Sequence, residues 1–261
     1  MPRSHDFDDD PAPFEHIAGD DGAGVLVVCD HASAALPARL GDLGLDAPTR
    51  RSHVAWDIGA AEVARGLAAR LGCPAVLAGI SRLVVDCNRA PGEAGWMPAV
   101  TCGVPVPGNV GLAAAEVEWR AAAWYRPYHA EVAAALDRLR QGGGVPAVVS
   151  VHSFTPRLGL AARPWHVGVL WNRDPRLAQP LIAGLSACSR LVVGDNQPYS
   201  AREINHTLDS HAGAAGLPHV SVEIRQDLLA DPAGTTHWAM VLAELLAPPL
   251  ADPGLHRIET Y

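Results

Sequence analysis

The sequence predicts one domain of the α/β class, with a mixed, mostly parallel sheet flanked by helices. Short apolar segments alternate along the chain with longer segments of helical periodicity, a pattern typical of strands joined by helical crossovers. The chain has 261 residues, of which 49% are apolar and 18% charged, and this suits one large domain with its own core. No repeat or long linker divides the sequence, so we expect a single domain over 1–261, with 1–20 as a flexible or peripheral segment.

Six segments are predicted to be strands, because they are short, apolar and bounded by Gly, Pro or Asp. They are 24–29 (GVLVVC), 75–80 (AVLAGI), 82–87 (RLVVDC), 147–152 (AVVSVH), 166–171 (HVGVLW) and 219–224 (HVSVEI). Several of them end in polar residues, which places polar side chains at one edge of the sheet.

Helices are predicted between these strands. The segment 57–72 has apolar residues at helical spacing, an Asp at its start and a Gly at its end. The segment 113–141 is helical in composition, and Pro127 is expected to kink or divide it. Residues 175–188 and 235–247 complete the predicted helices.

Charge and composition exclude several classes of partner. The net charge is −8 and the 20 basic side chains form no block, which argues against a nucleic-acid partner. The apolar runs are far shorter than the roughly 20 residues that span a bilayer, so no membrane association is expected. The acidic N-terminus does not resemble a secretory signal, and the five cysteines are an odd number without CxxC spacing. We therefore predict a cytoplasmic protein with free thiols.

Two histidines follow or end predicted strands and are the first candidates for chemistry. His31 comes directly after the first strand and His152 ends the fourth, and ligands of open α/β sheets bind outside the carboxyl ends of the strands. Two imidazoles and one carboxylate, with a fourth position open for water, are what a catalytic zinc ion requires. A single histidine at a strand end is more often structural, so the pair carries this hypothesis.

Further motifs resemble the N-formylglutamate amidohydrolase family, in particular its branch of predicted amidohydrolases. They are 25–33 (VLVVCDHAS), 80–91 (ISRLVVDCNRAP), 148–156 (VVSVHSFTP), 195–200 (DNQPYS), 207–212 (TLDSHA) and 216–229 (GLPHVSVEIRQDLL), which together span most of the chain. A more distant resemblance is to the zinc carboxypeptidases, through 86–89 (DCNR), 150–155 (SVHSFT) and 222–225 (VEIR). The resemblance implies a fold like that of the zinc carboxypeptidases, in the phosphorylase/hydrolase-like group.

The resemblance also implies one bound Zn²⁺, with His31 and His152 as two of its ligands. Carboxypeptidases place their acidic ligand three residues after the first histidine, where this chain has Ala34. Asp57, at the start of the next predicted helix, is therefore expected to supply the missing oxygen. A plain helix N-cap is the alternative interpretation of Asp57. Weaker rivals for the ligand position are Cys29, Asp30 and His53, and two histidines with one carboxylate also accept other divalent ions.

Glu223 is the predicted catalytic residue. It ends an apolar strand, where an unpaired carboxylate is costly, and it therefore needs either a partner or a chemical role. The resemblance implies that it takes a proton from a zinc-activated water and passes it to the leaving nitrogen. The alternative interpretation is an ion pair with Arg225.

Substrate binding is assigned to a second group of residues. The resemblance implies that Asn88 and Arg89 hold a substrate carboxylate, with Arg82 as a second cationic contact. Three further candidates, for which a structural turn or cap is an equal alternative, are Asn196, Tyr199 and His211.

These residues predict a zinc-dependent hydrolase that cleaves the amide bond of a small N-acyl, in particular N-formyl, acidic amino acid, releasing formate and the amino acid. Its expected partner is a small carboxylate substrate. Two alternatives stay open: a carboxypeptidase or broader N-acyl amino acid deacylase, and a non-catalytic binding protein on the same fold.

Overall fold

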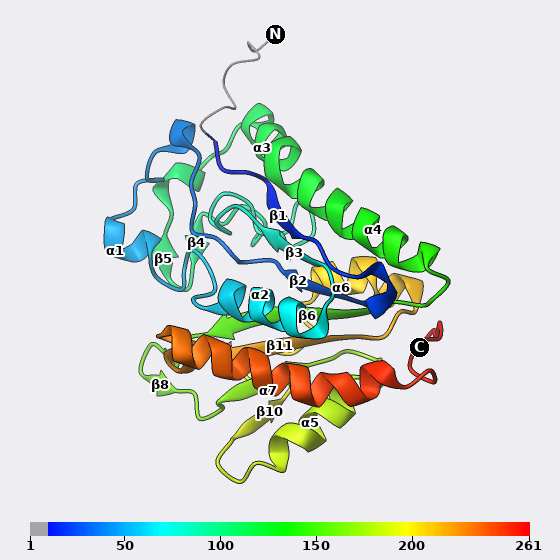
Figure 1. Ribbon diagram of the computed structural model, residues 1–261. Helices are drawn as coiled ribbons and strands as arrows, with labels where there is room; N and C mark the ends of the chain where they lie inside the picture. The colour runs from blue at the N-terminus through cyan, green and yellow to red at the C-terminus, as the bar shows by residue number, and fades with distance from the viewer. Residues whose placement is uncertain (1–9) are drawn as a thin grey trace.

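The computed structural model describes residues 10–261 of the chain. Its centre is a seven-stranded mixed sheet in the order β1-β3-β2-β6-β11-β9-β10, which confirms the predicted α/β class (Figure 1). The strands of this sheet are β1 (Phe14–Ile17), β2 (Val25–Cys29), β3 (Ala75–Ala78), β6 (Ala147–Phe154), β9 (Val167–Leu170), β10 (Val193–Asp195) and β11 (His219–Arg225). Two small hairpins lie outside it, β4 (Val100–Thr101) with β5 (Val104–Pro105) and β7 (Arg157–Leu158) with β8 (Ala161–Ala162).

The middle of the sheet is parallel. β3, β2, β6 and β11 run in one direction, whereas β1 and β9 pair antiparallel with their neighbours β3 and β11. In β2, β6 and β11 the side chains are buried on both faces, apart from the last residue of β11. Continuous apolar strands of this kind require helices on both sides.

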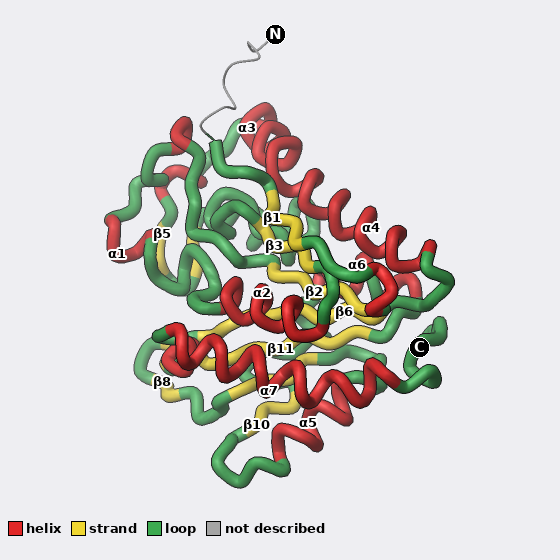
Figure 2. The backbone as a smooth tube through the Cα atoms, in the orientation of Figure 1, coloured by secondary structure: helices red, strands yellow, loops and turns green. Residues whose placement is uncertain are grey.

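Helices cover both faces of the sheet, as Figures 1 and 2 show. One face packs against α2 (Ala60–Leu71), α5 (Ala178–Ser186) and α7 (Pro232–Ala251). The other packs against α4 (Arg126–Gln141) and α6 (His206–His211). The remaining helices are α1 (Ala47–Arg50) and α3 (Ala114–Arg120). No helix of residues 10–261 is both long and apolar enough to cross a membrane.

Most predicted elements are present. Five of the six predicted strands correspond to β2, β3, β6, β9 and β11, and the predicted helices correspond to α2, α5, α7 and the α3–α4 pair. A π-helical stretch, Ala121–Tyr125, joins α3 to α4 with helical backbone throughout, and Pro127 lies in the first turn of α4. The expected change in the helix near Pro127 is therefore a change of hydrogen-bonding pattern and not a break. The sequence did not indicate β1, β10 or α6.

The predicted strand 82–87 is wrong, because this segment forms turns. Its apolar residues Leu83, Val84 and Val85 are buried in a separate cluster beneath the loops, not in the sheet. Side chains, and not a neighbouring strand, satisfy the backbone carbonyls of this segment. Asn109 Nδ2 donates to the carbonyl of Leu83 at 2.7 Å, and Arg120 Nη1 donates to that of Val84 at 3.2 Å. The apolar, β-branched residues of this segment therefore indicate that it is buried, and not that it pairs in a sheet.

The segment 1–20, predicted to be flexible or peripheral, contributes one edge strand to the sheet. Residues 14–17 form β1, which pairs antiparallel with β3. Residues 1–9 lie outside the described part of the chain.

Candidate active site

The site is built where three neighbouring parallel strands end. β2, β6 and β11 are adjacent, so their carboxyl ends come to one edge of the sheet. His31 lies two residues beyond β2, while His152 in β6 is in direct register with Glu223 in β11. All three residues border a cavity of about 310 Å³, which is in the size range of small-molecule sites.

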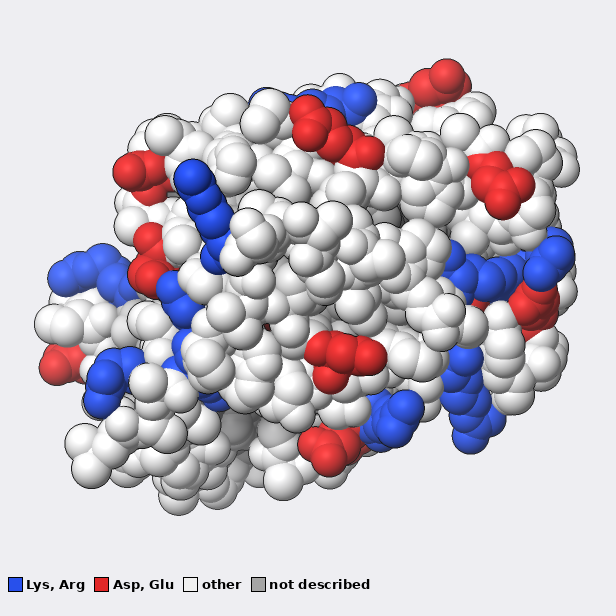
Figure 3. All heavy atoms as spheres, turned by 90° about the horizontal axis from the view of Figure 1, so that it is seen from below, with Lys and Arg blue, Asp and Glu red and all other residues white. Residues whose placement is uncertain are grey.

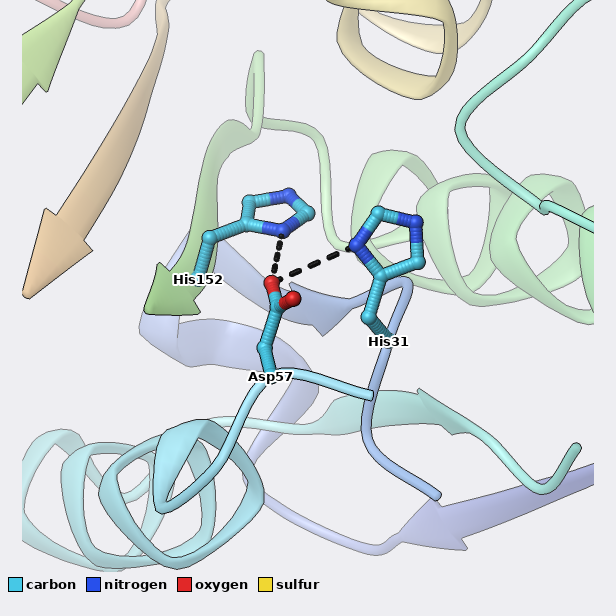
Figure 4. Close-up of side chains that lie close together, drawn as sticks. All are labelled: His31, Asp57 and His152. Carbon is cyan, nitrogen blue, oxygen red and sulfur yellow. Dashed lines mark hydrogen bonds and ion pairs between the residues drawn. The ribbon is translucent and has the colours of Figure 1, made fainter. Parts of the chain in front are cut away.

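Asp57 joins the two histidines, although it is far from both in the sequence. Its Oδ2 lies 2.8 Å from His152 Nδ1 and 3.3 Å from His31 Nδ1 (Figure 4). The Asp57 amide donates to the carbonyl of His31, which holds the two loops together. Helix α2 begins only at Ala60, and its cap residue is Gly59. Asp57 is therefore not the side-chain cap of this helix.

The three residues fit a divalent metal ion. One donor atom from each of His31, Asp57 and His152 lies within 4.8 Å of the other two. Metal bonds of about 2.0–2.1 Å in tetrahedral geometry place ligand atoms about 3.4 Å apart. The 3.3 Å between Asp57 Oδ2 and His31 Nδ1 matches this spacing, whereas the 2.8 Å to His152 Nδ1 is a hydrogen-bond distance. Two imidazoles and one buried carboxylate are also the donor set that a catalytic zinc site uses.

A carboxylate faces the second ring nitrogen of His31. Asp86 Oδ1 lies 2.7 Å from His31 Nε2, and Asp86 Oδ2 accepts from Arg82 at 2.8 Å. This contact keeps the hydrogen of the neutral imidazole on Nε2 and leaves the Nδ1 lone pair for a cation. Burial would raise the pKa of Asp86, but Arg82 and His31 hold it well below its ordinary value.

A carboxylate also faces the second ring nitrogen of His152, at ion-pair distance and without a regular hydrogen bond. Asp30 Oδ2 lies 3.3 Å from His152 Nε2, and its Oδ1 accepts from the hydroxyls of Tyr128 at 2.8 Å and Thr207 at 2.7 Å. Burial would raise the pKa of Asp30, but His152 and His31 bring it down to about 2. Asp30 is therefore an anion, and it lies on the side of the His152 ring opposite Asp57.

Glu223 is buried beside this group and lacks a partner. Its Oε2 has no hydrogen bond among the described residues, and its side chain borders the cavity. The predicted alternative, an ion pair with Arg225, is not formed, because Arg225 binds Asp227 at 2.7 Å. Burial, reinforced by Asp57 and opposed by His152, raises the pKa of Glu223 to about 7. A carboxylate with this pKa can both accept and donate a proton near neutral pH.

Asn88 and Arg89 also line the cavity. Asn88 Oδ1 accepts from the backbone amide of Thr207, so its Nδ2 hydrogens are left for a ligand. Arg89 forms no ion pair with any carboxylate of residues 10–261. Gly95 packs against it, and a Cβ atom at Gly95 would lie 2.9 Å from Arg89 Nε. The structure thus leaves a hydrogen-bond donor and a free guanidinium at this end of the cavity.

Of the other four predicted substrate residues, two line the cavity and two do not. Tyr199 and Arg82 line the cavity, but Arg82 is already bound by Asp86 and lies 3.6 Å from Asp57. Asn196 and His211 do not line it. Asn196 Oδ1 accepts from two backbone amides, those of Trp171 and Ala201, and the His211 ring stacks on His129.

Among the rival metal ligands, Cys29 is fully buried in the core that faces α2, and His53 lines the cavity outside the metal-ligand group. Asp30 lies against His152 and outside the group formed by His31, Asp57 and His152. Sequence reasoning assigns Asp86 no role, although it opens the DCNR motif, and ranks Asp30 only as a weak rival. The sequence signal that could have identified both aspartates is their position within two residues of a candidate site residue, His31 for Asp30 and Asn88 for Asp86.

The site thus combines a buried His/Asp/His group with an unpaired carboxylate at the carboxyl edge of a mixed α/β sheet. The model of the N-formylglutamate amidohydrolase family matches residues 23–230. The chain belongs to this family, and it is therefore an amidohydrolase, an enzyme that hydrolyses amide bonds.

Two solved structures show the same fold. A gene product from Agrobacterium tumefaciens is 38% identical, with a TM-score of 0.86 over 92% of this chain and 95% of its own. N-formylglutamate amidohydrolase from Ralstonia eutropha is 22% identical, with a TM-score of 0.64 over 92% of this chain and 97% of its own, and this likeness concerns the fold alone. Comparison with curated protein sequences gave no match.

Proposed function

We propose that this amidohydrolase is metal-dependent and cleaves a small N-acyl, in particular N-formyl, acidic amino acid to formate and the free amino acid. The observation that carries the proposal is the buried, unpartnered Glu223 carboxylate next to His31, Asp57 and His152. A proton acceptor with a pKa of about 7 beside a cation site is suited to the activation of water.

In this proposal His31, Asp57 and His152 would hold one Zn²⁺, and the bound ion would supply Lewis-acid chemistry at the amide carbonyl and the attacking water. Arg89 and the Nδ2 group of Asn88 bind the substrate carboxylate and fix the amide near Glu223. Glu223 takes one proton from the water as the new C–O bond forms. It returns this proton to the amide nitrogen as the C–N bond breaks, so the amine leaves neutral and the carboxylate is restored.

The proposed compartment is the cytoplasm. All five cysteines lie in the described part of the chain, and all are free. Free thiols agree with a reducing environment.

Elemental analysis and a hydrolysis screen test the proposed function. Purified protein should contain about one divalent ion per chain, and His152→Ala should lose both the ion and the activity. The screen compares N-formyl and N-acetyl amino acids with dipeptides that carry a free C-terminus. Faster cleavage of dipeptides would replace the proposal by a carboxypeptidase, and metal-loaded protein that hydrolyses none of these would indicate a binding protein.

A further inference from the structure

A group of polar aromatic side chains lies against the loop that carries Asn88 and Arg89. Its members come from the π-helical stretch, α4 and α6, and we call them the Tyr–His group: Tyr125, His129, His206 and His211. Their rings contact one another, with the centroid of His129 4.3 Å from that of Tyr125 and 5.1 Å from that of His211. All four are among the described residues, and none of them lines the catalytic cavity. The proposed chemistry therefore gives them no direct role.

Tyr125 and His206 hold the backbone of Arg89. The hydroxyl of Tyr125 donates to the Arg89 carbonyl at 3.0 Å, and its oxygen lies 2.7 Å from His206 Nε2. A hydroxyl has one hydrogen, so His206 Nε2 donates to Tyr125. The other ring nitrogen, His206 Nδ1, lies 3.3 Å from Ser210 Oγ, which can donate to it. These contacts form one chain of hydrogen bonds that ends at the Arg89 carbonyl.

His129 and His211 hold the backbone of Cys87 in a similar way. A carbonyl can only accept, so His129 Nε2, which lies 3.0 Å from the Cys87 carbonyl, carries the hydrogen. Burial, reinforced by His211, lowers the pKa of His129 to about 4, so the ring is uncharged at neutral pH. His129 Nδ1 therefore accepts the hydrogen of His211 Nε2 at 2.8 Å. This second chain ends two residues before Arg89.

The two chains enclose Asn88, whose Oδ1 accepts from the backbone amide of Thr207 in α6 at 3.1 Å. Residues 86–89 lie outside the regular helices and strands, so no backbone ladder fixes their conformation. Side-chain contacts to their carbonyls therefore take over this task. A binding group must be held to within about 0.5 Å of its productive position, which a free loop does not achieve.

We propose that the Tyr–His group positions Asn88 and Arg89 for the carboxylate of the substrate. This inference rests on the proposed function, in which Asn88 and Arg89 bind that carboxylate. The group acts through the backbone carbonyls of the loop, so its members are positioning residues and not catalytic ones. Without these contacts the loop would sample more conformations, and substrate binding would have to order it, which lowers affinity.

The test is the effect of Tyr125→Phe on two reactions, the hydrolysis of N-formylglutamate and that of N-formylglutamine amide, in which amide groups replace both carboxylates. Phenylalanine keeps the ring but cannot donate to the Arg89 carbonyl. Loss of this hydrogen bond should raise KM for N-formylglutamate about 2- to 10-fold and leave kcat unchanged, because the carboxylate is held alike in the ground state and in the transition state. The kcat/KM of the uncharged amide should not change.

Further variants locate the effect. Tyr261→Phe is the matched control, because it removes a tyrosine hydroxyl that lies outside the cavity and binds Glu259, and both reactions should stay as in the wild type. His206→Gln keeps a donor in place of Nε2 and should therefore have a lower KM than His206→Leu. Arg89→Met should raise KM more than Tyr125→Phe does, and the two changes should not add, because they act on the same contact.

Three results would overturn the positioning role: an unchanged KM in folded, metal-loaded Tyr125→Phe, a loss confined to kcat, or equal slowing of both substrates. The last two are the results that a merely structural role would give, because it lowers the amount of active enzyme. If Tyr125→Phe does not fold, the two His206 variants decide, and equal KM values in them would count against the proposal.

If no N-formyl compound is hydrolysed, the proposed function fails, and calorimetry with L-glutamate decides on the positioning role. Wild-type protein should then bind L-glutamate more tightly than Tyr125→Phe does, and Tyr261→Phe should bind it like the wild type. Equal binding by wild type and Tyr125→Phe, or no binding by the wild type, would refute the role of the Tyr–His group.

Discussion

At the scale of single residues, the chemistry depends on side chains that have no obvious partner in the protein. Glu223 is the clearest case, because a buried carboxylate without a hydrogen bond at Oε2 is costly to folding. It lies next to His31, Asp57 and His152, where the proposed mechanism needs a proton acceptor. Asp86 shows the opposite situation, because its two oxygens contact His31 and Arg82, and Asp30 is intermediate, because its Oδ1 accepts two hydrogen bonds whereas its Oδ2 lies only at ion-pair distance from His152.

Glu223→Gln should abolish turnover without loss of the metal. Glutamine keeps the size of the side chain but cannot accept a proton, and the loss of a positioned general base costs ~10²–10⁴-fold in kcat. Single-turnover rates and metal content are to be measured on the same sample. A metal-loaded Gln variant that works at the wild-type rate would refute the role of Glu223 as base.

Asp30→Asn should weaken metal binding although Asp30 is not a metal ligand. The amide cannot supply the negative charge that orients His152, and the loss of such an outer contact costs ~10–100-fold in metal affinity. Competition with a chelator measures this affinity. Thr207→Val, which removes only one of the donors to Asp30, is the milder comparison and should lie between wild type and Asp30→Asn. Unchanged affinity in Asp30→Asn would make the aspartate purely structural.

At the scale of elements, the start of α2 sets the position of Asp57. Gly59 has a φ of 79°, and a Cβ atom there would lie 2.5 Å from Leu229 Cβ. This glycine therefore lets the chain turn from the metal-ligand loop into the helix while packing against the segment after β11. In the segment 82–87, side chains determine the backbone conformation. Asn109 and Arg120 donate hydrogen bonds to backbone carbonyls that would be paired with a neighbouring strand if the segment lay in a sheet.

Gly59→Ala should lower both stability and metal affinity. An alanine in this left-handed backbone conformation lowers the free energy of unfolding by about 1 kcal/mol. The steric overlap of its Cβ atom with Leu229 lowers it by about 1–3 kcal/mol more, as overpacking does. Gly72→Ala is the matched control, because Gly72 has a φ of 67° but open space around its Cβ position. Urea unfolding should therefore show a smaller loss for Gly72→Ala, and only Gly59→Ala should weaken the metal site. Equal losses in both variants would mean that backbone strain alone acts at Gly59.

At the scale of the whole molecule, the densest group of buried charges surrounds His31 and His152, where Asp30, Asp57 and Asp86 are all buried. Figure 3 shows basic and acidic residues in small mixed groups on the face it presents, without a broad patch of one sign. This agrees with the prediction of a small-molecule substrate. The buried charges around His31 and His152 instead determine how the stability of the fold depends on pH.

For the metal-free protein, Glu223→Gln should become more stable than the wild type as the pH rises. Burial raises the pKa of folded Glu223 to about 7, so the folded state holds a proton that the unfolded state releases at lower pH. The stability linked to this proton is fully present below the ordinary glutamate pKa and is lost as the pH rises through about 7. Glutamine does not titrate, and other groups contribute alike in both proteins. Urea unfolding at pH 5, 6, 7 and 8 measures the difference, and a constant difference would contradict the raised pKa.

The sequence by itself determined the features that depend on local order along the chain. Apolar runs of strand length predict β2, β6 and β11, and the polar residues that follow or end these runs are His31, His152 and Glu223. Because parallel strands align their carboxyl ends, the sequence pattern alone is enough to place these residues at one edge of the sheet.

Tertiary structure alone decided which side chains meet. Asp57 reaches both histidines across 26 and 95 residues of sequence, and Thr207 reaches Asp30 across 177. The segment 82–87 has the composition of a strand, but the side chains packed over it, not its own residues, decide that it forms turns. Pairing and burial depend on contacts between distant segments, and local sequence patterns do not encode them.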